Sequence, residues 1–327
     1  MKAWLNEFFR KIVGEDIYNT TTSLIDYKLH LSKDYNYKGD GTVYSDYVVF
    51  MADGKLKHGG LADRLRAMVS LYYYCKLVNV SFKAYFVSPF NLTEYLVPNV
   101  YDWEIDYNQL SFDNVKAKAI IVKNNRNDNL KYLKKRISSD ISKKQLHIYT
   151  NIAINGIDYK QEFYELFKPS AYLQEEILKN KQEIGGKYVS VTFRFQQALG
   201  DFKESFNKPL STIEQNLLIE KCLAFICKVK NKHSDYEKVL VTSDSVKFLR
   251  IAKEKNDFVY TIPGVIHHID YTKDAGQMHY VKSFVDLYML SAADYLYSYS
   301  TGVMYSNSGF AVFAAAIGGK PHKRVVE

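Results

Sequence analysis

Residues 188–195 read YVSVTFRF, and this run determines how the second half of the chain is interpreted. Its β-branched and aromatic residues are typical of a buried β-strand. Downstream of it, short apolar runs alternate with stretches of helical periodicity. We expect strands at 239–242, 258–262 and 295–299, and helices at 211–230, 245–255, 280–292 and 309–317. This alternation predicts an α/β domain in which helices cover both faces of a parallel sheet.

The first half of the chain contains a similar unit. Strands are expected at 44–51, 80–87, 116–123 and 145–149, and helices at 61–76 and 156–183. We place the boundary between two domains near Gly185-Gly186, which gives domains of residues 1–180 and 181–327. The N-terminal run from Trp4 to Ile12 is amphipathic and predicts a short helix that packs on the body. Basic residues in the same run also allow a role at a membrane surface.

Length and composition favour a two-domain globular protein. The chain has 327 residues, which suits two domains of roughly 150 residues each. Its 47% hydrophobic and 24% charged residues exclude the disordered and fibrous classes. No apolar stretch approaches the roughly 20 residues of a membrane span, and the N-terminus lacks the apolar core of a signal peptide. We therefore expect a cytoplasmic protein, with contact at the inner membrane surface as an addition.

The charge of the chain directs attention to its arginines. The net charge is +8, yet only eight of the 44 basic residues are arginines. Lysine is a mobile, solvated cation, whereas arginine forms planar bidentate contacts with phosphate and carboxylate groups. Arg64, Arg66 and Arg194 fall in the two stretches that most resemble motifs. These positions favour an anionic small molecule as the partner.

The stretch HGGLADRLR, residues 58–66, could bind an anion. Gly59 and Gly60 would let the backbone approach a ligand, the following helix start offers free N–H groups, and Arg64 adds charge. The alternative is a tight turn followed by a solvated helix face. Neither a P-loop nor a dinucleotide-binding fingerprint is present.

Arg194 stands inside a strand-like run, where an unpaired charge is expensive to desolvate. We expect its side chain to point beyond the strand end, toward an anion or toward a structural carboxylate such as Asp201 or Asp244. Asp244 follows the apolar run at 239–242 and suits hydroxyl or base contacts, although Ser243 or Asp244 could equally cap the next helix.

Hydroxyl and amide side chains precede the last predicted helix. They form two groups, Ser300-Thr301 and Ser306-Asn307-Ser308. Small neutral groups in front of a helix N-terminus suit a diphosphate, and a simple turn and cap is the alternative. Ligands of parallel sheets bind beyond the carboxyl ends of the strands. Arg194, Asp244 and Ser300 follow three different predicted strands and should therefore meet at one sheet edge.

In their order and spacing, these stretches resemble the motifs of the fucosyltransferase superfamily that includes the α1,2-, α1,6- and protein O-fucosyltransferases. HGGLADRLRA resembles the N-terminal glycine motif of that superfamily. Arg194 matches the arginine of its H-x-R strand, although Thr192 stands where the histidine would be. Gly200-Asp201-Phe202 resembles the Gly-Asp-Phe that follows.

The remaining motifs of the resemblance lie near the C-terminus. TSDS, residues 242–245, resembles a Ser/Thr-Asp-Asp stretch in which Asp244 is matched and Ser245 replaces the second aspartate. SNSGFAVFAA, residues 306–315, together with the preceding run, resembles the final motif. That motif can be aligned on Ser300-Thr301 or on Ser306-Asn307-Ser308.

The resemblance implies a GT-B fold, in which two Rossmann-like domains with parallel sheets face each other across a cleft. The C-terminal domain would hold GDP-fucose as donor, with Arg194 on its diphosphate, and the N-terminal domain would serve the acceptor. The implied reaction is inverting, metal-independent transfer of fucose to a hydroxyl of a surface glycan such as lipopolysaccharide or capsule, and it uses no cofactor. The base that accepts the proton would be Asp63, His58 or Asp201.

Other interpretations remain open at this point. The threonine at position 192 allows a GT-B enzyme with another donor, such as GDP-mannose, a UDP-sugar or CMP-Kdo, or an inactive carbohydrate- or nucleotide-binding relative. The lysine-rich stretch 131–144 would suit a nucleic-acid-binding protein, but basic residues are otherwise dispersed. A metal site is not expected, because the chain has no D-x-D motif and the adjacent His267-His268 lack a third ligand.

Overall fold

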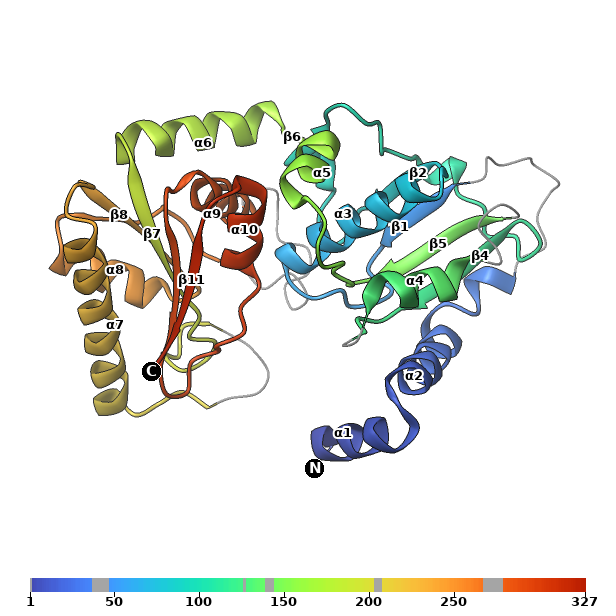
Figure 1. The fold of residues 1–327 in the computed structure, drawn as a ribbon, viewed down its shortest axis with the longest axis horizontal. Coiled ribbons are helices and arrows are strands. Elements are labelled where there is room, and N and C mark those ends of the chain that lie inside the picture. Colours follow the sequence, from blue (N-terminus) through green and yellow to red (C-terminus); the bar gives the residue numbers. More distant parts are fainter. Residues whose placement is uncertain (1, 37–46, 126–127, 139–143, 203–207, 267–278) are drawn as a thin grey trace. The chain divides into compact units, whose positions relative to one another are not determined.

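The computed structural model describes residues 2–36, 47–125, 128–138, 144–202, 208–266 and 279–327 (Figure 1). The chain forms two compact units. Unit 1 comprises residues 1–92 and 98–167, and unit 2 comprises residues 93–97 and 168–327. The short strands β3 (Leu96–Pro98) and β6 (Phe167–Pro169), where the chain passes from one unit to the other, pair with each other. The expected boundary after residue 180 falls inside α6 (Ala171–Ile184), a helix of unit 2.

Unit 1 is built on a parallel sheet with the strand order β2-β1-β5-β4. Its strands are β1 (Val48–Ala52), β2 (Phe82–Phe86), β4 (Ala117–Val122) and β5 (Gln145–Thr150). Its helices are α1 (Lys2–Val13), α2 (Glu15–His30), α3 (Leu61–Leu77), α4 (Asn129–Ile137) and α5 (Tyr159–Leu166). Every residue of β1 is buried, as expected for a central parallel strand. One sheet face packs its apolar side chains on Leu31 and Tyr35, which follow α2.

Unit 2 contains a second parallel sheet, with the order β11-β10-β7-β8-β9. Its strands are β7 (Tyr188–Phe193), β8 (Lys238–Ser243), β9 (Val259–Tyr260), β10 (Leu296–Ser300) and β11 (His322–Val326). Its further helices are α7 (Thr212–Lys232), α8 (Val246–Lys255), α9 (Val281–Ala292) and α10 (Phe310–Gly318). From β7 the chain builds outward to β9, and it then returns to add β10 and β11 on the other side of β7. This is the doubly wound arrangement of nucleotide-binding folds, and its strand order reverses between β7 and β10.

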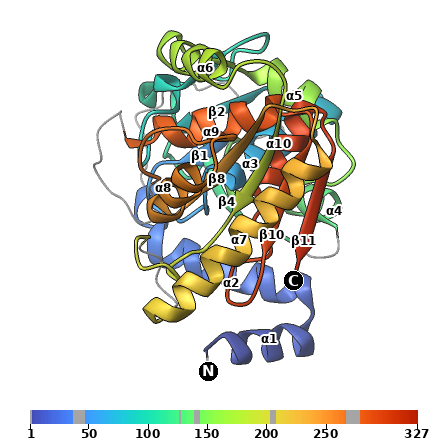
Figure 2. The ribbon, with the colours of Figure 1, turned by 90° about the vertical axis from the view of Figure 1, so that its left-hand side faces the viewer.

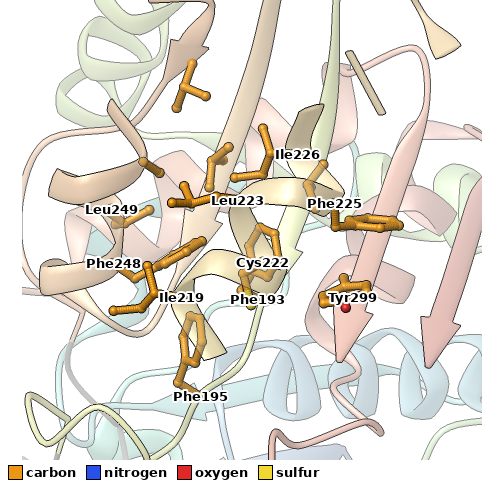
Figure 3. Packing of buried hydrophobic residues seen from close by; sticks show 14 of the residues in the cluster. Phe193, Phe195, Ile219, Cys222, Leu223, Phe225, Ile226, Phe248, Leu249 and Tyr299 are labelled. Atoms are coloured by element: carbon orange, nitrogen blue, oxygen red, sulfur yellow. The ribbon is translucent and has the colours of Figure 1, made fainter. Parts of the chain in front are cut away.

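The two faces of the unit 2 sheet differ in chemistry because side chains alternate along each strand. Val189, Val191 and Phe193 of β7 belong to an apolar core formed with α7 and α8. Figure 2 shows these two helices with the strands of unit 2, and Figure 3 shows Phe193 packed among side chains of α7 and α8. Ser190 and Thr192 therefore point to the opposite face, on which the hydroxyl of Tyr188 donates to the carbonyl of Met289 in α9. The polar face is thus the one covered by α9 and α10.

A close helix contact fixes α10 on that face. A Cβ atom placed on Gly318, the last residue of α10, would lie 2.1 Å from the carbonyl oxygen of Ser291 in α9. Only glycine permits such an approach of two backbones. The position of α10, and with it the loop that enters the helix, therefore depends on this residue.

Most elements agree with the sequence predictions, but several differ, among them α4 and the short strands β3 and β6, for which no element was expected. The predicted helix at 156–183 is two helices, α5 and α6, separated by β6 and by Pro169, which cannot donate to a helix. Residues 15–30 form α2, and the C-terminal residues 322–326 form β11, neither of which was expected from the pattern. The predicted strand at 44–51 begins at Val48 within the described residues.

Candidate functional site

A pocket in unit 2 lies at the point where the strand order reverses. It is lined by residues from the ends of β7 and β10 and from the loop before α10: Thr192, Arg194, Ser298, Tyr299, Ser300, Tyr305, Ser306 and Ser308. Apart from Arg194 and the two tyrosines, every lining side chain is a small hydroxyl. The wall is therefore rich in neutral hydrogen-bonding groups around one cation, which suits an anionic, multiply hydrogen-bonded ligand.

Arg194 is held at this pocket by Asp244. Its Nη1 lies 3.1 Å from Oδ2 of Asp244, whose side chain is only 2% exposed. The same carboxylate accepts hydrogen bonds from the backbone N–H groups of Phe195 and Gln196, at 2.8 and 2.7 Å. Burial raises the pKa of Asp244, while Arg194 and the backbone donors act in the opposite direction. The guanidinium also lies over the ring of Phe202, at 4.8 Å from its centroid.

The predicted partner of Arg194 was Asp201 or Asp244, and the structure selects Asp244. Asp201 instead caps α8, because its Oδ2 accepts hydrogen bonds from the hydroxyl of Ser245 and the backbone N–H of Lys247, at 2.9 and 2.8 Å. Asp201 does not line the pocket. The residue of this segment that caps α8 is Ser245, whose hydroxyl accepts from the N–H of Phe248, and not Ser243 or Asp244 as the alternative interpretation had it.

Ser300 is a buried lining residue whose hydroxyl is unsatisfied within the described part of the chain. Its side chain is 4% exposed, and among the described residues its Oγ has no hydrogen-bond partner. A buried hydroxyl without a partner costs free energy, of the order of 1–3 kcal/mol. Thr192, by contrast, exchanges a hydrogen bond with the hydroxyl of Thr242 at 2.9 Å. Of these two hydroxyls on neighbouring strands, that of Thr192 has a hydrogen-bond partner and that of Ser300 has none within the described residues.

The loop before α10 bends over the end of β7. The N–H of Tyr305 donates to the carbonyl of Arg194 at 3.1 Å. From β11, Arg324 donates to Oδ1 of Asn307 at 3.2 Å and to the carbonyl of Ser308 at 3.4 Å. Both alternative alignments of the final motif reach one pocket, since Ser300, Ser306 and Ser308 all line it. Thr301 is buried and Asn307 is exposed, and neither lines the pocket.

Sequence reasoning missed the lining residues Ser298, Tyr299 and Tyr305 and the neighbouring residues His322 and Arg324. Ser298 lines the pocket, and its hydroxyl shares a hydrogen bond with Nε2 of His322 at 3.0 Å. His322 and Arg324 belong to β11, which was not predicted. Ser298 could have been found, since the run LYSYS places its two serines on the same face of a strand.

The glycine loop of unit 1 is held by its own side chains. Gly59 has a φ of +86°, and a Cβ at this position would lie 2.7 Å from Oδ2 of Asp63. That carboxylate accepts from the N–H of Gly60 at 3.2 Å, and its other oxygen accepts from Arg66 at 2.8 Å. Asp63 is thus an N-terminal cap of α3 that remains 40% exposed.

Arg64 and His58 point into unit 1 rather than to the surface. Arg64 is 4% exposed and donates to the backbone carbonyls of Gly59 and Ser88, at 3.2 and 3.1 Å. His58 is also buried, and its Nδ1 lies 3.1 Å from the carbonyl oxygen of Thr150. Because a carbonyl only accepts, this contact requires a proton on Nδ1, and in the neutral ring Nε2 is then the basic nitrogen.

Metal ligands do not gather in the described part of the chain, where no group of three or more His, Cys, Asp or Glu side chains is placed to hold an ion. His267-His268 lie outside the described residues.

Comparisons with known proteins identify the fold. A scan against protein-family models gives no match, and a search of curated proteins gives none either. Among solved structures, the NodZ α1,6-fucosyltransferase soaked with GDP-fucose aligns over 84% of this chain and 92% of its own, with 12% identity and a TM-score of 0.53. The fucosyltransferase NodZ from Bradyrhizobium aligns over 83% and 93%, with 14% identity and a TM-score of 0.53. The predicted fold is therefore confirmed: the chain has the GT-B fold of these fucosyltransferases, with two Rossmann-like domains built on parallel sheets.

Proposed function

We propose that this protein is a glycosyltransferase whose unit 2 binds the diphosphate of a nucleotide sugar in the pocket around Arg194. The observation that supports this most strongly is the pairing of Arg194 with Asp244 beside a wall of hydroxyls, at the strand reversal where doubly wound sheets bind ligands. NodZ, which has the same fold, was soaked with GDP-fucose. The specific donor we propose is GDP-fucose, and the acceptor is a hydroxyl of a lipopolysaccharide, capsule or other lipid-linked glycan.

The proposed reaction is a single displacement with inversion. An acceptor oxygen forms a bond to the anomeric carbon while the bond from that carbon to the β-phosphate oxygen breaks, and GDP leaves with the bonding electron pair. Negative charge develops on the departing diphosphate, where the guanidinium of Arg194 and hydroxyl donors such as Ser300 would stabilise it. This charge stabilisation by side chains is the reason we propose a metal-independent reaction without a cofactor.

The acceptor hydroxyl must lose a proton to a base as it attacks. Asp201 is occupied as the cap of α8, which leaves Asp63 and His58 as the proposed candidates. The side chain of Asp63 is 40% exposed, and the basic nitrogen of His58 is set by its contact with Thr150. Replacing each in turn, Asp63→Asn and His58→Gln, should abolish transfer for the true base while leaving donor binding intact.

The central experiment is calorimetric titration of the full chain with GDP. We expect Arg194→Ala to weaken GDP binding by at least about tenfold, because a charge-assisted contact is lost. Arg250→Ala is the matched control, since Arg250 also belongs to unit 2 but is 71% exposed, and its ion pair within the described residues is with its helix neighbour Glu254. Equal affinity of the Arg194 variant and the wild type would refute the proposed site. Transfer that stops when a chelator is added would refute metal independence.

A different donor is the second candidate function, and Thr192 is the observation that favours it. In the superfamily that the sequence resembles, a histidine occupies this position, whereas here a neutral threonine is paired with Thr242. The donor pocket therefore lacks one ring that could contact the sugar or phosphate. Thermal-shift titration with GDP-fucose, GDP-mannose, UDP-sugars and CMP-Kdo would identify the donor, because a ligand that binds only the folded state raises its stability.

A further inference from the structure

The N-terminal helices α1 and α2 of unit 1 carry a continuous set of exposed apolar side chains. Those of α2 recur at helical spacing, so they occupy one face of the helix. The set, called here the α1–α2 surface, has exposures between 47% and 70% and comprises Phe8, Phe9, Ile12, Ile17, Leu24, Ile25 and Leu29. The expectation that the apolar face of the first helix packs on the body is therefore wrong for Phe8, Phe9 and Ile12.

The amphipathicity of α2 is inverted relative to a helix of an ordinary soluble domain. Its buried residues are the polar Asn19 and Ser23. Asn19 donates to the carbonyl of Asn124 at 3.3 Å, and Asp16 accepts from the side chain of Asn125 at 2.8 Å. A surface helix normally buries its apolar stripe and exposes its polar one. Since α2 does the reverse, its outward face is suited to contact with an apolar partner.

The acidic side chains of α2 form ion pairs with neighbouring basic residues. Asp16 binds Lys135 at 3.0 Å, and Asp26 binds Lys123 at 2.7 Å. Glu15 pairs in the same way with Arg10, at 3.3 Å. The negative charges of the helix are therefore neutralised by neighbouring cations.

Lysines, in contrast, remain on the α1–α2 surface. Lys28 lies one turn after Leu24 on the exposed stripe of α2, and Lys11 is exposed in α1. Neither lysine has an acidic partner among the residues that the structure describes. The exposed Lys131 and Lys134 of α4 lie beside α2, to which α4 is joined by the Lys135–Asp16 pair. The surface thus combines apolar side chains with unpaired cations.

This combination matches an anionic lipid surface. Leucine, isoleucine and phenylalanine side chains insert at the boundary of headgroups and acyl chains, while lysines extend to the lipid phosphates. A symmetric pair of copies would instead bring the same face, with Lys11 and Lys28, against itself, where like charges repel. In the described part of the chain no helix is long and apolar enough to cross a bilayer.

We propose that the α1–α2 surface binds the surface of an anionic lipid bilayer, with its apolar side chains in the interface and its lysines at the phosphates. The inference rests on the helices alone and does not depend on the proposed transferase activity. For an enzyme with a lipid-linked acceptor, such binding would concentrate the protein where that acceptor is found.

The test is co-sedimentation of the full chain with vesicles of phosphatidylcholine alone or mixed with phosphatidylglycerol. We expect binding to the mixed vesicles that weakens at high salt, because the lysine contacts are screened. The double variant Leu24→Ser, Leu29→Ser should bind at least about tenfold more weakly, since apolar carbon is lost from the interface. The control is Val100→Ser, Val115→Ser, which changes two equally exposed apolar residues of unit 1 outside α1 and α2.

Absence of wild-type binding to the mixed vesicles would overturn the proposal, and so would undiminished binding of the leucine variant. Sedimentation velocity supplies a further decisive outcome: a dimer that the leucine substitutions abolish would assign the surface to a second copy. GDP titration of the same leucine variant separates the two proposals, because a variant that loses vesicle binding and keeps GDP affinity shows that the surfaces act independently.

Discussion

Arg194 Nη1 lies 3.1 Å from Asp244 Oδ2, and that carboxylate also accepts from the two backbone N–H groups that follow Arg194. One side chain at the end of β8 thereby fixes both the direction of the guanidinium and the path of the chain leaving β7. Asp244 is almost fully buried, whereas the side chain of Arg194 is 21% exposed. Arg194 is therefore held by the protein while part of its side chain stays accessible to solvent.

Asp244→Asn should damage both the stability of unit 2 and its binding of GDP. The substitution removes the charge that balances Arg194, and breaking a buried pair costs on the order of 3 kcal/mol. We expect a loss of that size in chemical denaturation and at least about tenfold weaker GDP binding in calorimetry. Unchanged GDP affinity in a folded Asn variant would show that Asp244 does not position Arg194 for a ligand.

Ser300→Ala should separate ligand binding from stability. The variant removes a buried hydroxyl that has no partner among the described residues, so the free protein should be as stable as the wild type or more stable by about 1 kcal/mol. GDP affinity should fall by about five- to tenfold if the hydroxyl binds the donor.

The matched control for this prediction is Ser190→Ala. Ser190 is equally buried on the same sheet face, but its hydroxyl lies 3.4 Å from the carbonyl of Tyr295, to which it donates. That variant should lose some stability and keep its GDP affinity. A Ser300 variant with reduced stability and normal GDP binding would mean that its hydroxyl serves the fold.

The alternation of strands and helices in unit 2 could be predicted because each element has the period of its own secondary structure. The placement of Arg194 at a strand end followed from the cost of burying its charge. β11 could not be predicted, because its first three residues are polar and it is ordered by pairing with β10 at the sheet edge. Because β11 was not predicted, His322 and Arg324 were not recognised as residues near the pocket.

Arg64 shows a different limit of sequence reasoning. The motif HGGLADRLR placed Arg64 and Arg66 together as anion-binding candidates, yet Arg64 lies on the buried stripe of α3 with Leu61 and Met68. Residues three and four positions apart lie on the same face of a helix, so this spacing already indicated that Arg64 shares a face with Leu61 and Met68. Sequence reasoning assigned Arg64 to an anion instead, whereas the backbone carbonyls of Gly59 and Ser88 accept hydrogen bonds from its buried guanidinium.

Gly318→Ala should destabilise unit 2 by about 3 kcal/mol, because a Cβ would lie 2.1 Å from the carbonyl oxygen of Ser291 and α10 would have to move. The displacement would carry the Ser306–Ser308 loop with it, so GDP binding should weaken as well. Thermal unfolding and GDP titration measure both effects. As a control, Gly156→Ala in unit 1 meets no atom within 4 Å, and it should leave GDP binding unchanged although its φ of +79° costs some stability. An alanine variant at 318 with wild-type stability would show that α9 and α10 are not locked together.

The stability of unit 1 should depend on pH through His147. Burial, with a smaller contribution from the charge of Lys55, lowers the pKa of His147 to about 3. Its hydrogen bonds agree with a neutral ring: Nε2 donates to Oε1 of Gln145 at 2.7 Å, and Nδ1 accepts from the hydroxyl of Tyr35 at 2.6 Å. In the unfolded chain the ring takes up a proton near pH 6.5. The unfolded state therefore binds the additional proton between about pH 6.5 and pH 3, and stability should fall as the pH decreases through this window, by about 1.4 kcal/mol per unit.

The variant His147→Gln isolates this contribution. It should be less stable than the wild type at neutral pH, but its stability should fall less steeply from about pH 6 to pH 4, by the same 1.4 kcal/mol per unit. Tryptophan fluorescence during urea denaturation reports the transition, because both tryptophans, Trp4 and Trp103, belong to unit 1. His30→Gln, which replaces an exposed histidine of α2, is the control and should keep the wild-type slope. Parallel pH profiles of the His147 variant and the wild type would show that the buried imidazole takes up a proton without unfolding the unit.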